Sequence, residues 1–257
     1  MKNPRVFREK LFWILLIPLV WEIIARSGLV PALILPPLEE VLRSFLSESL
    51  SGGLLAGTGR SLLYILAGLS AGILSALVLT AGAHLWSPLR SLLEVLISLL
   101  HPLPGIALLP VALLIFGVGA GPVFLILLHS VLWPLCISFQ NGFDQVPPVF
   151  RRIARNYRLS PAGYFFRIMI PAAFPSLFSG LRIAWARSWR ALLSAEMIFG
   201  VVGGKGGLGW YIFNRRVFMD TPGMYAGLLM LVLLGLTVEN LLFGRLEALT
   251  IGRWGDQ

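Results

Sequence analysis

Charged, aromatic and hydroxyl-bearing residues recur at helical spacing in the apolar run at about 170–199. At about 100° per residue, one stripe about 60° wide holds four of them, and a neighbouring stripe holds three more. The first stripe consists of Arg182, Trp185, Trp189 and Glu196, and the second of Arg187, Arg190 and Ser194. Guanidinium groups suit carboxylate, sulfonate or phosphate groups, and tryptophan faces suit flat or cationic bodies. These residue types therefore indicate weak, transient binding of a small solute.

Ionisable groups inside such a run face a cavity, a partner or one another, because exposure to lipid costs several kcal/mol. We expect the first stripe to line a solute path, joined by His101 beside a proline-rich break. For the second stripe we favour a structural role, in ion pairs with Glu196 or Glu94 or at a contact between two copies. His129 is expected to be a helix-contact residue with its hydrogen bonds made inside the protein.

The sequence offers little other chemistry. Its three histidines and single cysteine show no metal-ligand spacing, and Cys136 reads as a small buried hydrophobe. The segment GKGGLG at 204–209 matches the dinucleotide pattern G-x-G-x-x-G. That site needs a strand before the glycines and a helix after them inside a βαβ unit, which this sequence does not predict. These glycines instead indicate tight turns and close backbone approach.

The composition indicates an integral membrane protein. The chain has 257 residues, of which 57% are hydrophobic and 13% charged, against roughly 25% charged in soluble domains. No charged residue lies between Glu94 and Asp144. The net charge of +9 does not indicate a nucleic-acid partner, because such proteins place their charge on a soluble face. Lipid is therefore the expected surrounding.

Six apolar runs are long enough to cross about 30 Å of hydrocarbon. They lie at about 10–26, 59–83, 88–116, 121–140, 170–199 and 223–244. The first is expected to be a retained signal-anchor helix, because no small-x-small cleavage site follows it. In the third, Pro102, Pro104 and Pro110 predict a broken or kinked helix. Between the first two runs, the spacing of Val41, Leu42, Phe45 and Leu46 predicts a short amphipathic surface helix.

The distribution of lysine and arginine predicts the orientation. Six crossings place both termini on one side, where the connections carry twelve basic residues against six on the other. Because cytoplasmic loops are enriched in these residues, both termini are predicted to be cytoplasmic.

A basic stretch at 151–171, RRIARNYRLSPAGYFFRIMIP, lies on the same side and contains five arginines and no acid. On a helix, four residues form one apolar face, and four arginines cover the rest. The apolar face is Phe150, Ile153, Ala154 and Tyr157, and the arginines are Arg151, Arg152, Arg155 and Arg158. Such a helix either lies on anionic lipid or is presented to a cytoplasmic partner.

A resemblance favours the second interpretation. The segment ARNYRLSPAGYFFRIMIPAAFPSLFSGLRIAWARSWRALLSAEM resembles the EAA-loop region of membrane subunits of ATP-binding cassette importers, in the nitrate, sulfonate and taurine branch. The family pattern is E-A-A, three residues, G, nine residues and I-x-L-P, and Ala154, Ile168, Ile170 and Pro171 match parts of it. LPPLEEVLRSF, PLPGIALLPVALLIFGVG and GGLGW agree with the same family, so the resemblance covers nearly the whole chain.

Three positions depart from the pattern. Arg152 replaces the usual glutamate, Ile153 the first alanine and Arg158 the glycine. A side chain at a turn with positive φ costs on the order of 1 kcal/mol, so the turn is expected to change shape or to use Asn156 or Gly163 instead. Arg152 suggests that the docking cleft of the partner is acidic.

The resemblance implies an all-α, type I importer permease fold with about six membrane helices, in one domain spanning 1–257. The loop at about 147–169 holds a cytoplasmic coupling helix, and Phe150, Arg151, Arg152, Ile153, Ala154, Arg155, Tyr157, Arg158, Ile168 and Pro171 are its expected ATPase-coupling residues. Expected partners are two ATPase chains carrying ATP and magnesium, a second permease chain in a homodimer, and an extracytoplasmic substrate-binding protein, in a bacterial inner membrane. This chain itself is expected to bind no cofactor and to catalyse nothing.

The implied substrate is a small anion such as taurine, another sulfonate or nitrate. Relatives with the same pattern also carry vitamin precursors and aromatic acids, so these stay as alternatives. An alternative of another class is a membrane scaffold protein with a lipid-binding basic loop.

Overall fold

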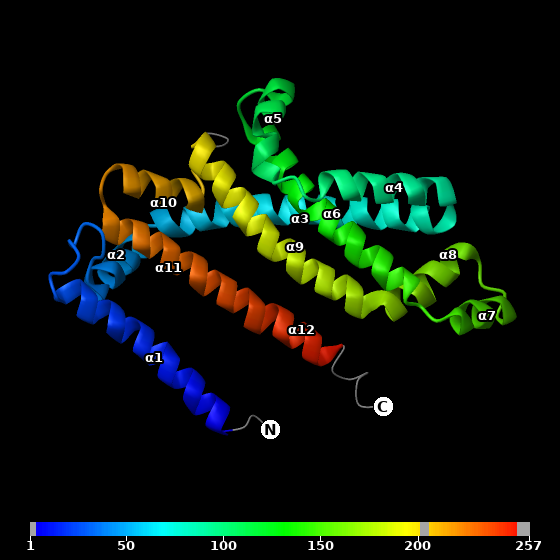
Figure 1. The fold of residues 1–257 in the computed structure, drawn as a ribbon, viewed down its shortest axis with the longest axis horizontal. Coiled ribbons are helices and arrows are strands. Elements are labelled where there is room, and N and C mark those ends of the chain that lie inside the picture. The colour runs from blue at the N-terminus through cyan, green and yellow to red at the C-terminus, as the bar shows by residue number, and fades with distance from the viewer. Residues whose placement is uncertain (1–3, 201–205, 251–257) are drawn as a thin grey trace.

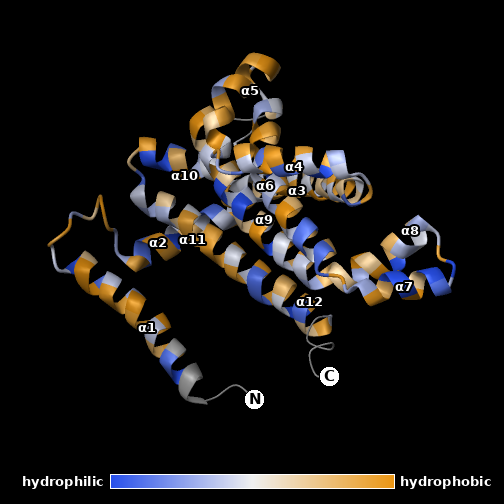
Figure 2. Ribbon diagram, turned by 45° about the vertical axis from the view of Figure 1, so that its right-hand side comes forward, coloured by the Kyte–Doolittle hydropathy of each residue, from blue (hydrophilic) through white to orange (hydrophobic). Residues whose placement is uncertain are grey.

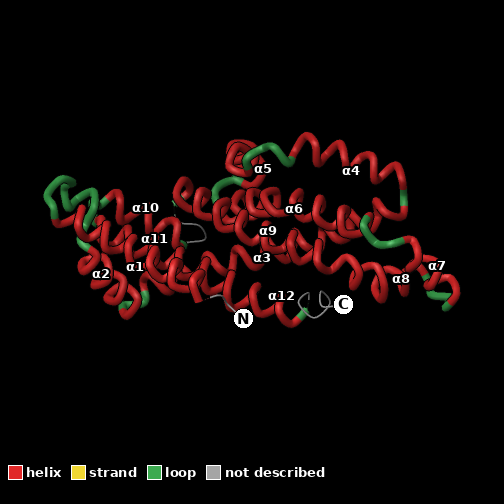
Figure 3. The backbone as a smooth tube through the Cα atoms, turned by 60° about the horizontal axis from the view of Figure 1, so that its bottom comes forward, coloured by secondary structure: helices red, strands yellow, loops and turns green. Residues whose placement is uncertain are grey.

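The computed structural model describes residues 4–200 and 206–250, and helices form nearly all of this part, with no strand in it (Figure 1 and Figure 3). The long helices are α1 (Pro4–Arg26), α3 (Gly53–Leu85), α6 (Ala120–Asp144), α9 (Ile170–Phe199) and α11 (Thr221–Thr237). The shorter ones are α2 (Leu38–Leu50), α4 (Ser87–Leu100), α5 (Leu109–Phe116), α7 (Pro148–Asn156), α8 (Pro161–Tyr164), α10 (Leu208–Val217) and α12 (Gly244–Leu249). A 3-10 turn, η1 (Gly105–Leu108), and two π-helical segments, η2 (Phe165–Met169) and η3 (Val238–Phe243), join some of them. The all-α membrane fold predicted from the sequence is confirmed.

The core lies where α6 packs between α3 and α9. Small residues allow these helices to approach closely, as is usual between helices in membranes. A Cβ at Gly72 on α3 would lie 2.4 Å from Val131 of α6, and one at Gly180 on α9 would lie 2.5 Å from Ser138 of α6. This three-helix contact holds α6 and α9 in a fixed register, which matters for the cavities described below.

Within residues 4–200 and 206–250, four helical segments are long and apolar enough to cross a membrane. They are Gly53–Leu85, Ala120–Asp144, Pro161–Phe199 and Thr221–Leu249, close to four of the predicted runs. The bent pair Ser87–Leu100 and Gly105–Phe116 makes a fifth if it counts as one span. Helix α1 coincides with the first predicted run but has charged residues at both ends, so a sixth span stays a prediction.

The predicted break in the third run is confirmed. Helix α4 ends at Leu100, and the segment that follows is bent by 93° from it. Pro102 and Pro104 lie in the break, where a proline has no N–H to continue the helical hydrogen bonds. As a result, α5 projects away from the bundle (Figure 1).

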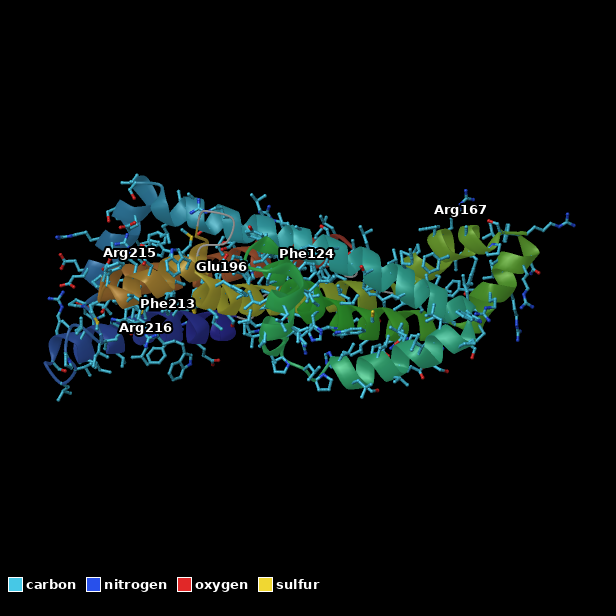
Figure 4. All side chains as sticks on the ribbon, turned by 90° about the horizontal axis from the view of Figure 1, so that it is seen from above. Phe124, Arg167, Glu196, Phe213, Arg215 and Arg216 are labelled. Carbon is cyan, nitrogen blue, oxygen red and sulfur yellow. The ribbon has the colours of Figure 1, made fainter. Side chains whose placement is uncertain are left out.

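The two ends of the molecule are built differently. The predicted surface helix is α2, which lies with α10 at one end, and α7 with α8 forms the other (Figure 1). Figure 4 shows Arg167 at the α7 and α8 end, and Arg215 and Arg216 at the opposite end. At that opposite end Arg215 bridges Glu48 of α2 and Asp220, and its Nη1 donates to Asp220 Oδ2 at 2.7 Å.

Candidate functional site

A cavity of about 600 Å³ lies between α6, α9 and the proline-rich break. Helix α6 contributes His129, Ser130, Trp133 and Pro134, α9 contributes Arg187, Arg190, Ala191 and Ser194, and the break contributes residues 101–106. Because the break has left the helical path, its backbone and His101 take the place of a straight helix along one wall. Irregular backbone at membrane depth is tolerated where it lines a cavity of this kind.

The cavity is electropositive. Arg187 and Arg190 both line it, no acidic side chain does, and neither guanidinium has an ion pair within residues 4–200 and 206–250. Arg190 Nε makes only a 3.3 Å contact with the carbonyl oxygen of Ala186, one turn earlier. Two unpaired cations in an apolar setting are costly unless an anion or water meets them. The cavity is therefore suited to an anion with two or more oxygen atoms.

The two histidines of the cavity differ. His129 Nδ1 accepts from Trp133 Nε1 at 3.1 Å, and its Nε2 lies 3.1 Å from the carbonyl oxygen of Leu103, so it acts as the donor there. His129 thus makes its hydrogen bonds within the protein. His101 instead has a buried Nδ1 without a hydrogen-bond partner in the described chain. The His101 ring is therefore better placed than the His129 ring to bind a solute.

The first predicted stripe lies elsewhere. Arg182 is ion-paired with Glu239 of η3 and Glu247 of α12, the second at 3.0 Å. Trp185 and Trp189 are buried and pack edge to face, with ring centroids 5.8 Å apart. None of these residues lines the cavity, which is formed by the second stripe and His101 instead. The geometry therefore differs from the expectation for both stripes, because Arg182 finds its acids 57 and 65 residues later in the chain.

Glu196, the last member of the first stripe, is 1% exposed and lies against the first residues of α10. Ser61 Oγ of α3 donates to its carboxylate at 2.8 Å, and the backbone N–H of Gly209 donates at 2.7 Å. The N–H of Leu208 in turn donates to Ser61 Oγ at 2.8 Å. A carboxylate suits a helix N-terminus, where free N–H groups and the helix dipole favour negative charge. This network, which the sequence did not predict, joins α3, α9 and α10.

The structure describes the GKGGLG segment from Gly206 onward, and it shows why glycine is needed there. A Cβ at Gly207 would lie 2.0 Å from Glu196 Oε1, and one at Gly209 would lie 2.9 Å from Oε2. The glycines thus let the backbone approach a carboxylate, as the sequence suggested, and no strand precedes them in the described chain. Gly204 and Lys205 lie outside the described residues.

The first part of the basic stretch lies on α7, a short helix that begins at Pro147 and Pro148. Ala154 is buried, whereas Ile153 is 39% and Tyr157 78% exposed. Phe150 and Ile153 line a groove of about 390 Å³ together with Arg167, Ile168, Pro171 and Ala172. The structure thus brings α7 beside the end of the EAA-like segment. The role of this surface in coupling stays a proposal.

Helix α7 is also held to the membrane bundle. Arg151 Nη2 lies 3.1 Å from His84 Nε2 at the end of α3. Close by, Arg90 forms a bidentate pair with Asp144 at 3.1 and 2.8 Å, which fixes the end of α6 just before α7 begins. Local sequence patterns do not reveal the Arg90 pair, because its members are 54 residues apart. Arg152 and Arg155 are exposed and have no ion pair in the described chain.

Arg158 keeps the turn that the family builds with glycine. Its φ is 51°, in the left-handed region. The N–H of Leu159 donates to the carbonyl of Ala154 at 2.9 Å, and that of Arg158 to the carbonyl of Arg155 at 3.0 Å, which is a Schellman motif. Asn156 and Gly163 both lie in helices, so neither replaces the missing glycine. Contrary to the expectation from the sequence, the turn therefore stays at Arg158 in the left-handed shape that suits glycine, and it carries a strained side chain.

Arg158→Gly is accordingly expected to stabilise the protein. A left-handed residue other than glycine costs about 1–2 kcal/mol, and the flexibility of glycine in the unfolded chain returns about 0.5–1 kcal/mol of that. We expect a gain of about 0.5–1 kcal/mol in unfolding free energy, measured by thermal unfolding of the purified chain in detergent. Arg155→Gly, within α7, is the control and should destabilise the chain. A lower unfolding temperature for Arg158→Gly would contradict the strain.

A known family of membrane proteins matches most of this chain. The sequence profile of the family "Binding-protein-dependent transport system inner membrane component" matches residues 68–248. The chain belongs to this family. The taurine transport system permease protein TauC of Escherichia coli is 28% identical over 225 residues, 86% of this chain and 80% of that protein. The putative aliphatic sulfonates transport permease protein SsuC of Escherichia coli is 30% identical over 216 residues, 84% of this chain and 81% of that protein. The nitrate import permease protein NrtB of Synechocystis is 35% identical over 122 residues, 48% of this chain and 43% of that protein.

Membership confirms the resemblance seen in the sequence and what it implies at the level of the family. The chain is a multi-pass inner membrane protein that serves as a non-catalytic permease subunit. ATP hydrolysis belongs to a separate subunit, and an ATPase and a substrate-binding protein are the implied partners. Among the described residues no group of His, Cys, Asp or Glu is arranged to hold a metal ion.

Proposed function

We propose that this permease forms the translocation path for a small oxoanion, with sulfonates such as taurine, and nitrate, as the leading candidates. The observation that carries the proposal is the pair of unpaired guanidinium groups, Arg187 and Arg190, in a cavity without an acid in the described chain. Planar guanidinium groups bind sulfonate and carboxylate oxygens in pairs. The names of the relatives agree, since they refer to taurine, aliphatic sulfonates and nitrate. The comparisons favour transport over a membrane scaffold.

The proposed assembly contains two copies of this chain, two ATPase chains that bind ATP and magnesium, and an extracytoplasmic binding protein. Helix α7 is the coupling helix, and both termini face the cytoplasm. Closure of the ATPase dimer moves α7, and Arg151 and the Arg90 pair transmit that movement to α3 and α6. The exposed arginines and apolar residues of α7 are what an ATPase groove with an acidic rim would contact.

The test is uptake by the reconstituted complex. Radiolabelled taurine and nitrate are supplied with the binding protein to proteoliposomes containing ATP, and initial rates are compared for two double variants. Arg187→Gln with Arg190→Gln is expected to lower the rate at least about tenfold, which corresponds to about 1.4 kcal/mol of lost stabilisation. Arg43→Gln with Arg216→Gln removes two exposed arginines outside the cavity and should leave the rate within about twofold. Equal rates for both double variants would overturn the path through this cavity.

A further inference from the structure

A second groove lies on the same pair of helices. It has a volume of about 310 Å³ and is lined almost entirely by neutral polar side chains. Helix α6 and its cap contribute Ser138, Asn141 and Gln145, and α9 contributes Pro175, Ser176 and Ser179. Within the described chain no charged residue lines it. Neither the family assignment nor the cavity with the arginines accounts for this groove.

The groove continues the face that lines the first cavity. On α6 the lining residues run from Ser130 and Pro134 in the cavity to Ser138, Asn141 and Gln145 in the groove, at steps of three or four residues. Such steps keep all five on one side of a helix. On α9 the lining residues run in the opposite sequence direction, Ser194, Arg190 and Arg187 in the cavity and Ser179 and Ser176 in the groove. The two hollows therefore follow one another along the seam of α6 and α9.

The boundary between the hollows is a tight point of that seam. Gly180 lies so close to Ser138 that a Cβ there would be 2.5 Å from the Ser138 Cβ and 2.8 Å from its Oγ. The hydroxyl of Ser138 is thus at the threshold of the groove. A solute that leaves the arginines toward the α7 end meets this hydroxyl first, since Arg167 and α7 mark that end of α9 (Figure 4).

The polar groups of the groove have unused hydrogen-bonding capacity. Within the described chain, the side-chain amides of Asn141 and Gln145 and the hydroxyls of Ser138 and Ser176 make no hydrogen bond. Ser179 Oγ donates to the carbonyl of Pro175 at 3.0 Å. Polar side chains in membrane helices usually pair with one another or face a water-filled space. Asn141 and Gln145 are exposed and Ser138 and Ser176 are half-buried, so the groove offers free hydrogen-bonding groups to water or to a polar solute that enters it.

We propose that this groove is a second station for the transported oxoanion, on the cytoplasmic side of the arginine cavity, where neutral amide and hydroxyl donors hold the anion before release. The inference rests on the proposed function. Hydrogen bonds from neutral donors are about half as strong as those from charged ones. Affinity therefore falls from the arginines to the groove, and the anion passes from a strong site through a weak one instead of dissociating directly from two cations.

The experiment introduces a charge without changing shape. Asn141→Asp is nearly isosteric, and Asp144 already lies one turn away on α6, so the variant is expected to insert and fold. Asn214→Asp is the matched control, because Asn214 is a half-buried amide on α10 that lies outside the candidate membrane spans and does not line the groove. Initial rates of taurine and nitrate uptake are measured in proteoliposomes with the complete complex. We expect Asn141→Asp to lower both rates about fivefold or more, and Asn214→Asp to change them less than twofold.

A second measurement does not depend on uptake rates. Ser179→Cys is made in a Cys136→Ala background, with Thr237→Cys on α11 as the control. Inside-out vesicles are treated with a methanethiosulfonate that carries a sulfonate group. The thiol introduced by Ser179→Cys is expected to react at least about five times faster than the thiol introduced by Thr237→Cys, and taurine should slow only the first of these reactions.

The outcomes separate the two proposals. If the wild-type complex moves neither anion, the proposed function fails and the second station fails with it. If the wild type transports but Asn141→Asp behaves like Asn214→Asp, or Ser179→Cys reacts no faster than Thr237→Cys, the groove is not on the path and only this inference is overturned.

Discussion

Replacing Gly207 by alanine is expected to lower the unfolding temperature of the purified permease by roughly 10 °C. A Cβ at this position would lie 2.0 Å from Glu196 Oε1 and 2.5 Å from Ser61 Oγ. No real contact is that short, so the loop, the carboxylate or both must move. Overpacking of this kind costs about 1–3 kcal/mol, and each hydrogen bond to a charged group that is lost costs about 1.5–3 kcal/mol.

The hydrogen bonds that Gly207→Ala would break are those that join α3, α9 and α10 at Glu196. The Glu196 carboxylate accepts from Ser61 on α3 and from the N–H of Gly209 on α10, so its displacement leaves a buried acid and a helix N-terminus unpaired. Arg60 adds a third contact, because its Nε donates to the carbonyl of Gly206 at 2.8 Å. A combined loss of about 3 kcal/mol or more is therefore expected.

Gly59→Ala is the matched control. Gly59 lies within α3, two residues before Ser61, and an added Cβ there has nothing within 4 Å. Because alanine favours a helix over glycine by about 0.5–1 kcal/mol, this variant should be as stable as the wild type or slightly more stable. Thermal unfolding in detergent, followed by size-exclusion chromatography, compares the three chains. Equal unfolding temperatures for Gly207→Ala and Gly59→Ala would show that Glu196 does not hold α10 in place.

Features governed by local rules could be predicted from the sequence. The break in the third run follows from Pro102 and Pro104, because a missing N–H ends a helix whatever surrounds it. The start of α7 at Pro147 and Pro148 and the polar face of the arginines follow from neighbouring residues in the same way. The turn at Arg158 is an exception, because the missing glycine predicted a changed or displaced turn, whereas the backbone hydrogen bonds of the Schellman motif hold the left-handed turn at Arg158.

Features that depend on partners distant in the sequence could not be predicted from it. Helical periodicity placed Arg182 and Arg187 on separate stripes but carried no information on which stripe faces the core. That choice is made by Glu239 and Glu247, which pair with Arg182 from the last helices and leave the second stripe to line the cavity. The Glu196 junction joins residues 135 positions apart, and only the close-set glycines at 206–209 hinted at it.

The second large effect is expected at the surface of α7. Tyr157→Ala should weaken binding of the partner ATPase at least about thirtyfold, since a buried interface tyrosine contributes about 2 kcal/mol or more. Tyr157 is 78% exposed in the isolated chain, and Ile153 and Val149 on the same side of α7 are exposed as well. Figure 2 shows hydrophobic and hydrophilic residues side by side along α7. An exposed aromatic residue among arginines is a typical anchor of an interface.

The variant tests docking and not folding. Tyr157 is the C-cap of α7 in a common backbone conformation, and its side chain is largely free of contacts with the bundle. Tyr157→Phe keeps the ring and should bind the ATPase within about threefold of the wild type. The measurement is a titration of the purified ATPase against each permease variant in nanodiscs.

The same titration distinguishes a docking helix from a helix that lies on lipid. If α7 lay on anionic lipid, Arg152 and Arg155, which have no ion pair in the described chain, would bind headgroups, and the loss of one tyrosine ring would leave ATPase affinity unchanged. If α7 docks into an acidic cleft, affinity falls with Tyr157→Ala and also with Arg152→Glu. Unchanged affinity in both variants would assign α7 to the membrane surface, and coupling would then have to pass through another part of the chain.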